Sequence, residues 1–337
     1  MPRTGIINNF HFDAEVFTDY MQEQSTINDI LLASGVLQYD PIIANAIGNS
    51  GNVAAVPMFS NIDAEADALN DDGKTNNVPT ELKGKKMLIM AMARMKAWKE
   101  KTYTRYLTGK SPLHNLANNL VVPYWKAQRQ LDLIATIQGV LGAEGMETHI
   151  TDLSTTSGSI QESNKIALTS TIDLGQKAVG DRRANFSLFI CHSAVAANLR
   201  KQELLQNVSY FSDVLQREVT LPMVNGMICL ETDTGTVDAS VSNFPVYHSY
   251  MVGRGAIGTA EKAVHKPYGV DFDHETNGGE EKLYTKQAYV YAPYGMSIKA
   301  QDIAEESPTR EELKNPANWE LATDNKFVMI ACIKSNG

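Results

Sequence analysis

A glycine-rich hexapeptide, Gly253 to Gly258 (GRGAIG), has the most enzyme-like spacing in the sequence. It matches G-x-G-x-x-G, follows a predicted strand and precedes Asp273, as in sites that bind a dinucleotide through its pyrophosphate and ribose. The segment after it, TAEKAVHKP, reaches Pro267 after about two helical turns, which is short for the crossover helix of such a site. The alternative to a nicotinamide-dinucleotide site is a turn whose glycines permit close backbone packing, and we favour that turn.

Cys191 and His192 could supply a thiol nucleophile and its base. Adjacent residues on a strand point to opposite faces, so a packed cysteine is the expected alternative. The seven histidines show no H-x-x-x-H or H-E-x-x-H spacing, and the three cysteines form no C-x-x-C pair. The sequence therefore predicts no catalytic residues, no cofactor and no metal site.

The amino-acid composition limits the classes of protein to which the chain can belong. The chain has 337 residues, of which 43% are hydrophobic, enough to bury a large core. It has no long uninterrupted apolar run and no secretory h-region, so we expect a cytosolic protein without a membrane partner. The formal net charge of −9 disfavours tight binding of a polyanion, so a nucleic acid would be enclosed by this protein without being gripped.

Two strand-like stretches, GNVAAVPMF (51–59) and MLIMAMARMKAW (87–98), flank a long polar stretch. A loop of this length inside a compact domain is usually functional, so we predict a ribbon that projects from the body. Acidic residues dominate its outgoing part and basic residues its return, which favours docking onto a neighbouring copy; the alternative is an ordinary solvated loop. The candidate contact residues here are Asp63, Glu65, Asp67, Asp71, Asp72, Lys74, Lys83, Lys85, Lys86, Arg94 and Lys96. In the preceding segment they are Phe12, Phe17 and Tyr20.

The longest predicted helix covers residues 111–142, from an N-cap at Ser111 to the glycines at its end. Pro123 lies inside it and predicts a kink or break near Val121. Its expected packing residues are Leu116, Leu120, Tyr124, Trp125, Leu131 and Ile134.

The sequence after the long predicted helix predicts an α+β region. Residues 186–192 and 327–333 are expected to be buried strands, and residues 282–295 a further strand. Ser193 is the expected N-cap of a helix, and Thr309 with Glu312 predicts a capping box.

The order of these segments resembles that of the major capsid proteins of tailed bacteriophages. The resemblance is carried by VFTDYMQEQSTINDILLASGVL, by GNVAAVPMF through KAW, by LTGKSPLHNLANNLVVPYWKAQRQLDLIATIQGVLG, and later by FSLFICHSAVAANLRKQ, YMVGRGAIG, AYVYAPYG and NPANWELATDNKFVMIACIKSN. None of these is a catalytic signature, and the specificity lies in their order and spacing over nearly the whole chain.

The resemblance implies a Hong Kong 97-type α+β shell fold. The segments would be an N-arm (1–49), an E-loop hairpin (50–98), a P-domain (99–145 and 296–337) with a spine helix (111–142), and an A-domain (146–295), with the last strand returning to the P-domain. The ribbon would lie across a neighbouring subunit, while the helix would stiffen each subunit.

The resemblance also implies partners and a location. Copies of the chain would form pentamers and hexamers of an icosahedral virion shell that encloses double-stranded DNA, assembled in the cytoplasm of the host bacterium. A portal and a separate scaffolding protein are expected, or else a chain already processed. Nothing identifies partners for a lysine crosslink, so none is predicted. An encapsulin-type nanocompartment, which shares the fold, is the alternative.

Overall fold

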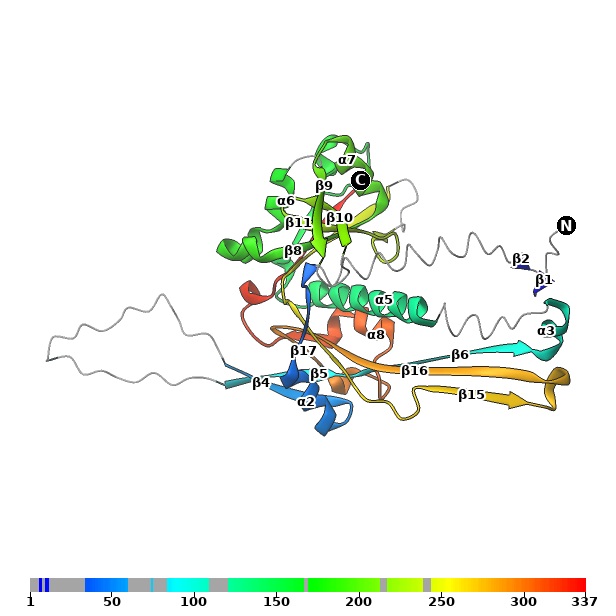
Figure 1. The fold of residues 1–337 in the computed structure, drawn as a ribbon. Helices are drawn as coiled ribbons and strands as arrows, with labels where there is room; N and C mark the ends of the chain where they lie inside the picture. Colours follow the sequence, from blue (N-terminus) through cyan, green and yellow to red (C-terminus); the bar gives the residue numbers. More distant parts are fainter. Residues whose placement is uncertain are drawn as a thin grey trace.

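The computed structural model describes residues 6–7, 10–11, 34–59, 74, 84–108, 121–166, 169–212, 217–238 and 244–337. Both helices and strands build it, so the predicted α+β class is confirmed. Two sheets lie on opposite sides of one long helix, α5 (Val121–Gly142) (Figure 1). A two-stranded ribbon, β4 with β5, and an arm of three paired strands, β6, β16 and β15, leave the lower part of the body in opposite directions (Figure 1).

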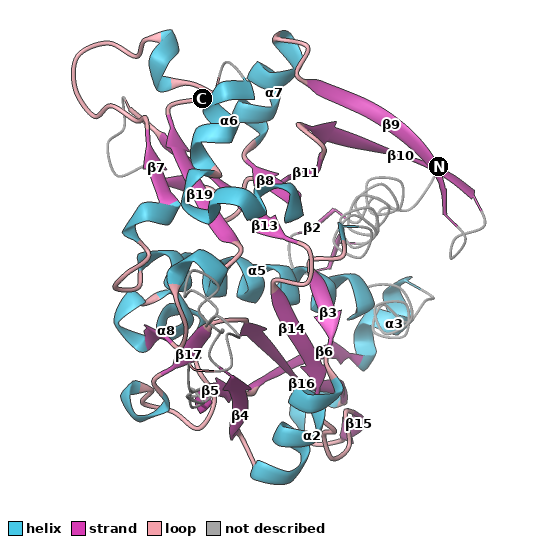
Figure 2. Ribbon diagram, turned by 90° about the vertical axis from the view of Figure 1, so that its left-hand side faces the viewer, coloured by secondary structure: helices cyan, strands magenta, loops and turns pink. Residues whose placement is uncertain are grey.

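The upper sheet has eight strands, and its central strands are buried on both faces, whereas residues 206–209 at one edge are exposed. Its order is β7 (Ile150–Asp152), β19 (Ile330–Ser335), β13 (Val246–Gly253), β8 (Phe186–Cys191), β11 (Met227–Glu231), β10 (Arg217–Val224) and β9 (Leu205–Ser212), with β12 (Val237–Asp238) beside β13. Two helices, α6 (Thr169–Gly175) and α7 (Ser193–Lys201), pack on one face, and α5 packs on the other (Figure 2). Strands buried on both faces have nearly continuous apolar sequences, which explains FSLFIC and IACI.

The lower sheet has five strands. Its order is β15 (Tyr268–Asp273), β16 (Glu280–Pro293), β14 (Ile257–Glu261) and β3 (Leu37–Tyr39), and β6 (Met92–Lys101) pairs with the other side of β16. The first turns of α5 pack on this sheet, where the indole Nε1 of Trp125 donates to Thr285 Oγ1 at 3.1 Å. The rings of Trp98 and Tyr124 meet edge to face at 5.2 Å between centroids.

The ribbon consists of β4 (Val53–Phe59) and β5 (Gly84–Met90), and Phe59 lies opposite Gly84 at its outer described end. A helix that the sequence did not predict, α2 (Pro41–Ser50), packs beneath the root of the ribbon. The Asp40 carboxylate caps α2 by accepting from the N–H of Ile42 at 2.8 Å, with proline at the first helical position.

Short elements complete the chain. They are β1 (Ile6–Ile7), β2 (Phe10–His11), α3 (Thr102–Thr108), β17 (Met296–Ile298), α8 (Arg310–Lys314) and β18 (Trp319–Leu321), with 3-10 turns at Glu147–His149, Glu162–Asn164, Lys177–Asn185, Thr276–Gly278, Ala300–Asp302, Pro316–Asn318 and Asn325–Phe327. The capping box of Thr309 and Glu312 at α8 is confirmed.

Three local predictions were wrong. The stretch 87–98 is divided at Ala91, so that β5 stays in the ribbon while β6 joins β16. The N-cap of α7 is His192, whose Nδ1 accepts from Ala194 N–H, because Ser193 already has helical geometry. The last strand is 330–335, since residues 325–327 form a 3-10 turn.

Strand pairing also groups the chain differently from the predicted domain boundaries. Residues 257–293, which were assigned to the A-domain, pair with β6 and β3 in the lower sheet. The last strand, β19, was expected in the P-domain but lies in the upper sheet between β7 and β13. These pairings join residues as far apart in the sequence as Leu37 and Ile257, and local sequence patterns do not encode them.

Candidate assembly surfaces

The glycine motif does not form a dinucleotide site. Gly253 ends β13, and strand β14 begins at Ile257 where a phosphate-binding site requires a helix N-terminus. A Cβ on Gly253 would lie 2.7 Å from Met329 Cβ, and one on Gly258 would lie 2.4 Å from Ile43 Cδ1. The glycines therefore serve close packing, as the favoured alternative predicted.

The Cys191 thiol is fully buried, and its Sγ lies 3.6 Å from Cys229 Sγ. This hydrogen bond with Cys229, followed by burial, raises the pKa of the Cys191 thiol, which disfavours a reactive thiolate. Within the described ranges, no cluster of three His, Cys, Asp or Glu side chains is arranged to hold a metal ion. Among the helices that the structure describes, none has both the length and the apolar character that a bilayer span requires.

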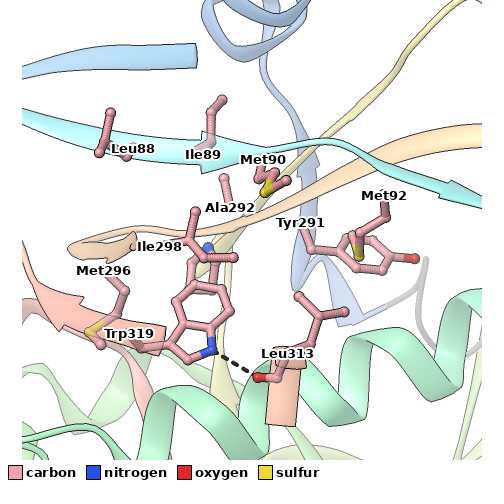
Figure 3. A pocket seen from close by; sticks show the side chains of 11 residues that line it. Leu88, Ile89, Met90, Met92, Tyr291, Ala292, Met296, Ile298, Leu313 and Trp319 are labelled. Atoms are coloured by element: carbon pink, nitrogen blue, oxygen red, sulfur yellow. Dashed lines mark hydrogen bonds between the residues drawn. The ribbon is translucent and has the colours of Figure 1, made fainter. Parts of the chain in front are cut away.

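An enclosed apolar cavity lies where the ribbon root meets the lower sheet and α8 (Figure 3). Leu88, Met90 and Met92 line one side, with the indole of Trp319 opposite, and Trp319 Nε1 donates to Leu313 O at 2.8 Å. Its volume is about 10 Å³, which is room for one water molecule at most. It is a packing gap and does not have the size of a substrate site.

One buried carboxylate joins the elements that carry the projecting parts. Asp132 of α5 is 0% exposed and accepts hydrogen bonds from Arg94 Nε at 2.9 Å, Arg310 Nε at 2.8 Å and Tyr289 OH at 2.7 Å. These donors come from β6, α8 and β16. Burial, followed by the charge of Asp132, raises the pKa of Tyr289, which keeps its hydroxyl a donor. Helix α5 is thereby hydrogen-bonded to both long strands of the arm.

The ribbon root is held by polar contacts to the C-terminal part of the chain. Leu88 N–H donates to Ser297 Oγ at 3.0 Å, and Ala93 N–H donates to Ser307 Oγ at 2.8 Å. Asn52 Nδ2 donates to the carbonyl of Glu306 at 3.0 Å. Of these bonds, the one from Leu88 reaches a backbone group of the ribbon itself, while those of Ala93 and Asn52 lie beside its inner end, so together they tie the base of the ribbon to residues 297–307.

The outer end of the arm is built around charged pairs. Lys99 Nζ donates to Glu280 at 3.2 Å, and Lys282 Nζ donates to Asp273 at 3.0 Å. The Lys282 ammonium, followed by the Thr276 hydroxyl, lowers the pKa of Asp273. The sequence suggested a functional role only for Asp273, as the acidic residue of the dinucleotide motif, and for none of these four as a structural pair; the crowding of charged residues around the Asn277 turn was the available signal.

The arm also exposes many large apolar side chains. On β6 and α3 they include Met95 at 80% and Tyr106 at 79% exposed, and on β15 they include Val270 at 64%. The other members are Tyr103, Leu107, Tyr268, Phe272 and Tyr284. An apolar surface of this extent is typical of a surface that another molecule covers.

The predicted contact residues are only partly within the described chain. Phe12, Phe17, Tyr20, Asp63, Glu65, Asp67, Asp71, Asp72 and Lys83 lie outside the described residues. Lys74, Lys85, Lys86 and Lys96 are exposed, as a contact residue must be in the isolated chain. Arg94 does not fit the predicted role of an inter-subunit contact, because its guanidinium already binds Asp132 within the chain.

The residues predicted to pack the spine helix are also only partly within the described chain. Leu116 and Leu120 lie outside the described residues. Trp125 and Ile134 are buried, while Tyr124 and Leu131 are half-buried. Pro123 lies in the first described turn of α5, and the residues before Val121, on which the predicted kink or break also depends, lie outside the described chain.

Comparison with known proteins was made over the whole chain. No protein-family profile matches the sequence. The chain is 25% identical to the major capsid protein of Bacillus phage SPP1 over 323 residues, which cover 95% of each chain.

Solved phage structures share its fold. The capsid of Ralstonia phage GP4 matches with a TM-score of 0.57 at 9% identity and covers 90% of this chain and 88% of its own. A structure from Microbacterium phage Oxtober96 matches with a TM-score of 0.51 at 10% identity, covering 90% of this chain and 89% of that one. The chain therefore has the Hong Kong 97-type fold of tailed-phage major capsid proteins.

Proposed function

We propose that this chain is the major capsid protein of a tailed bacteriophage and that its copies assemble into an icosahedral shell. The observation that carries the proposal is the match to the SPP1 capsid protein over 95% of both chains, together with the capsid fold. Its role is structural, and the projecting ribbon and arm supply what a shell subunit needs, namely surfaces that are incomplete in the isolated chain.

The assembly mechanism is cooperative. Rings of five or six copies use heterologous contacts that close, and the projecting parts connect adjacent copies. Each subunit is then held by several neighbours at once, so weak individual contacts give a stable shell. A net charge of −9 lets double-stranded DNA be enclosed without tight adhesion to the wall. We include in the proposal assembly in the host cytoplasm with a separate scaffolding protein and a portal.

Electron microscopy of the overexpressed protein, with and without a co-expressed scaffolding protein, tests this function. Closed shells, tubes or capsomer rings are the expected result. A monodisperse monomer under all conditions in the analytical ultracentrifuge contradicts it. Nucleic acid inside shells isolated from infected cells distinguishes a virion from an encapsulin-type compartment, which would hold a cargo enzyme.

A further inference from the structure

Strand β15 forms one edge of the arm (Figure 1). Among the described residues it pairs with β16 alone, so its other side has no strand beside it. Backbone N–H and C=O groups of successive residues point alternately to the two sides of a strand. Lys286 N–H donates to the O of Pro267, the residue before β15, so the backbone of Pro267 faces β16. The groups of Tyr268, Val270 and Phe272 therefore point out of the sheet, and within the described ranges no hydrogen bond reaches them.

The side chains of these three residues are large, apolar and exposed. They lie on one face of β15, because Tyr268, Val270 and Phe272 alternate with residues that face the other way. Val270 is in register with Leu283 of β16, which is buried under the first turns of α5. The helix covers Leu283 and leaves β15 uncovered. An apolar edge strand with open backbone groups is a template on which another strand can pair.

The glycine in the middle of this edge has no structural requirement within the described chain. The φ of Gly269 lies outside the left-handed region, and a Cβ built on it would meet no atom within 4 Å. A glycine inside a strand weakens the strand, and it often marks a place where another backbone approaches closely. Gly269 therefore agrees with a second strand that lies beside β15.

The sequence of β15 is complementary to itself in antiparallel pairing. When Val270 lies opposite Val270 of a second copy, Tyr268 lies opposite Phe272 and aromatic rings meet at both ends. The outward backbone groups of these residues then meet as hydrogen-bonded pairs. Lys266 precedes the strand and Glu275 follows it, and neither has an ion-pair partner in the part of the chain that the structure describes. Antiparallel pairing places the basic end of each strand beside the acidic end of the other.

The symmetry of this pairing agrees with a wall built from identical copies. Each copy contributes the same residues, so the contact is isologous and closes with two copies. Directly opposite residues of an antiparallel pair lie on the same face of the sheet. The two-fold axis is therefore perpendicular to the joined sheet, and helix α5 of both copies lies on one side of it. All subunits of a closed shell present the same side to its interior, which this arrangement satisfies.

We propose that β15 of one copy pairs antiparallel with β15 of a second copy about Val270, so that two arms share one continuous sheet. The backbone supplies the hydrogen bonds, the apolar side chains form one row across the joined strands, and the charged ends fix the register. This inference rests on the proposed function, because it names a surface through which copies of the chain associate.

A single cysteine tests the symmetric pairing, since Val270→Cys links two copies only when both bring this position to the axis. Opposite residues of a hydrogen-bonded antiparallel pair have Cα atoms about 5.5 Å apart, within the range of a disulfide. Assembled shells are oxidised with copper phenanthroline in air and analysed on denaturing gels without reductant. We expect a dimer band that reductant removes. The control is Tyr284→Cys on β16, because the two β16 strands would lie about 14 Å apart, at three strand spacings, and give no band. The native cysteines are buried and add no background.

Val270→Cys shells that give no dimer band overturn the inference and leave the proposed function intact, whereas a wild type that forms no assembly contradicts the proposed function itself. Charge exchange provides a second test that decides the question if Val270→Cys does not assemble. We expect Lys266→Glu and Glu275→Lys each to raise the concentration at which shells form by about threefold, and the double variant to return it to the wild-type value. Circular dichroism and urea midpoints of the unassembled protein confirm that the variants are folded. Single variants that assemble like the wild type, or a double variant that stays impaired, overturn the antiparallel register.

Discussion

The Asp132→Asn variant tests whether the buried carboxylate holds the subunit together. The side chain is 0% exposed and accepts from two guanidinium groups and one hydroxyl. The amide keeps the shape but has one acceptor oxygen, so its NH₂ group must face a donor, and both arginines lose their counter-charge. Breaking a fully buried pair costs about 3 to 5 kcal/mol. The side chains of Arg94 and Arg310 are 21% and 38% exposed, so solvent screens part of the ion-pair energy. We therefore expect the variant to lower the free energy of unfolding by about 2 to 4 kcal/mol.

Urea denaturation of the unassembled subunit measures this loss through the transition midpoint. The matched control is Glu261→Gln, which breaks the Arg129 pair at a carboxylate that is 70% exposed. We expect that control to change stability by no more than about 1 kcal/mol. If Asp132→Asn is no more destabilising than the control, the carboxylate does not stabilise the junction, and the reasoning is refuted.

Two further predictions concern packing and pH. Gly139→Ala in α5 places a Cβ 2.0 Å from Leu313 O, so we expect a loss of at least about 2 kcal/mol in urea denaturation. Gly48→Ala in α2, which has no atom within 4 Å of the new Cβ, is the matched control and should stabilise by about 0.5 to 1 kcal/mol. The buried ring of His149 donates from Nδ1 to Ile330 O at 2.8 Å, and burial lowers its pKa below the usual 6.5. The unfolded chain then binds a proton that the folded chain does not, so stability is full above about pH 6.5 and falls as the pH drops below it. His149→Gln should flatten urea midpoints between pH 7.5 and 5.5, and an unchanged slope would contradict this.

Local signals predicted the elements that form from local patterns. The apolar run at 186–192 and the alternating run at 282–295 became β8 and β16, and the pair Thr309 and Glu312 capped α8. Each of these depends on residues a few positions apart, so the sequence shows them directly. The glycines of Gly253 to Gly258 were also predicted correctly as packing residues, because the element after them was too short for a crossover helix.

The assembly surfaces depend on contacts that no local pattern contains. Asp132 meets Arg94, Tyr289 and Arg310, which lie between 38 and 178 positions away. The available signal was a single carboxylate within the apolar sequence Leu131 to Ile134, since a charge at such a position needs partners from elsewhere. The transfer of residues 92–101 from the ribbon to the lower sheet could not be predicted either, because it follows from pairing with β16.

The position of α5 explains how one subunit combines a rigid body with projecting parts. One core cluster contains Leu133 and Ile137 of α5 together with side chains from both sheets, so the helix is a shared wall between them. Separating the sheets would expose that cluster to water, and the body therefore moves as one unit. The ribbon and the arm start from this wall, and in the described part of the chain the outer residues of both, such as Lys85 and Lys86 of β5 and Met95 of β6, are exposed. A two- or three-stranded projection with exposed apolar side chains gains stability when another surface covers it. The same helix that makes the body complete thus leaves its extensions to be completed by neighbouring copies.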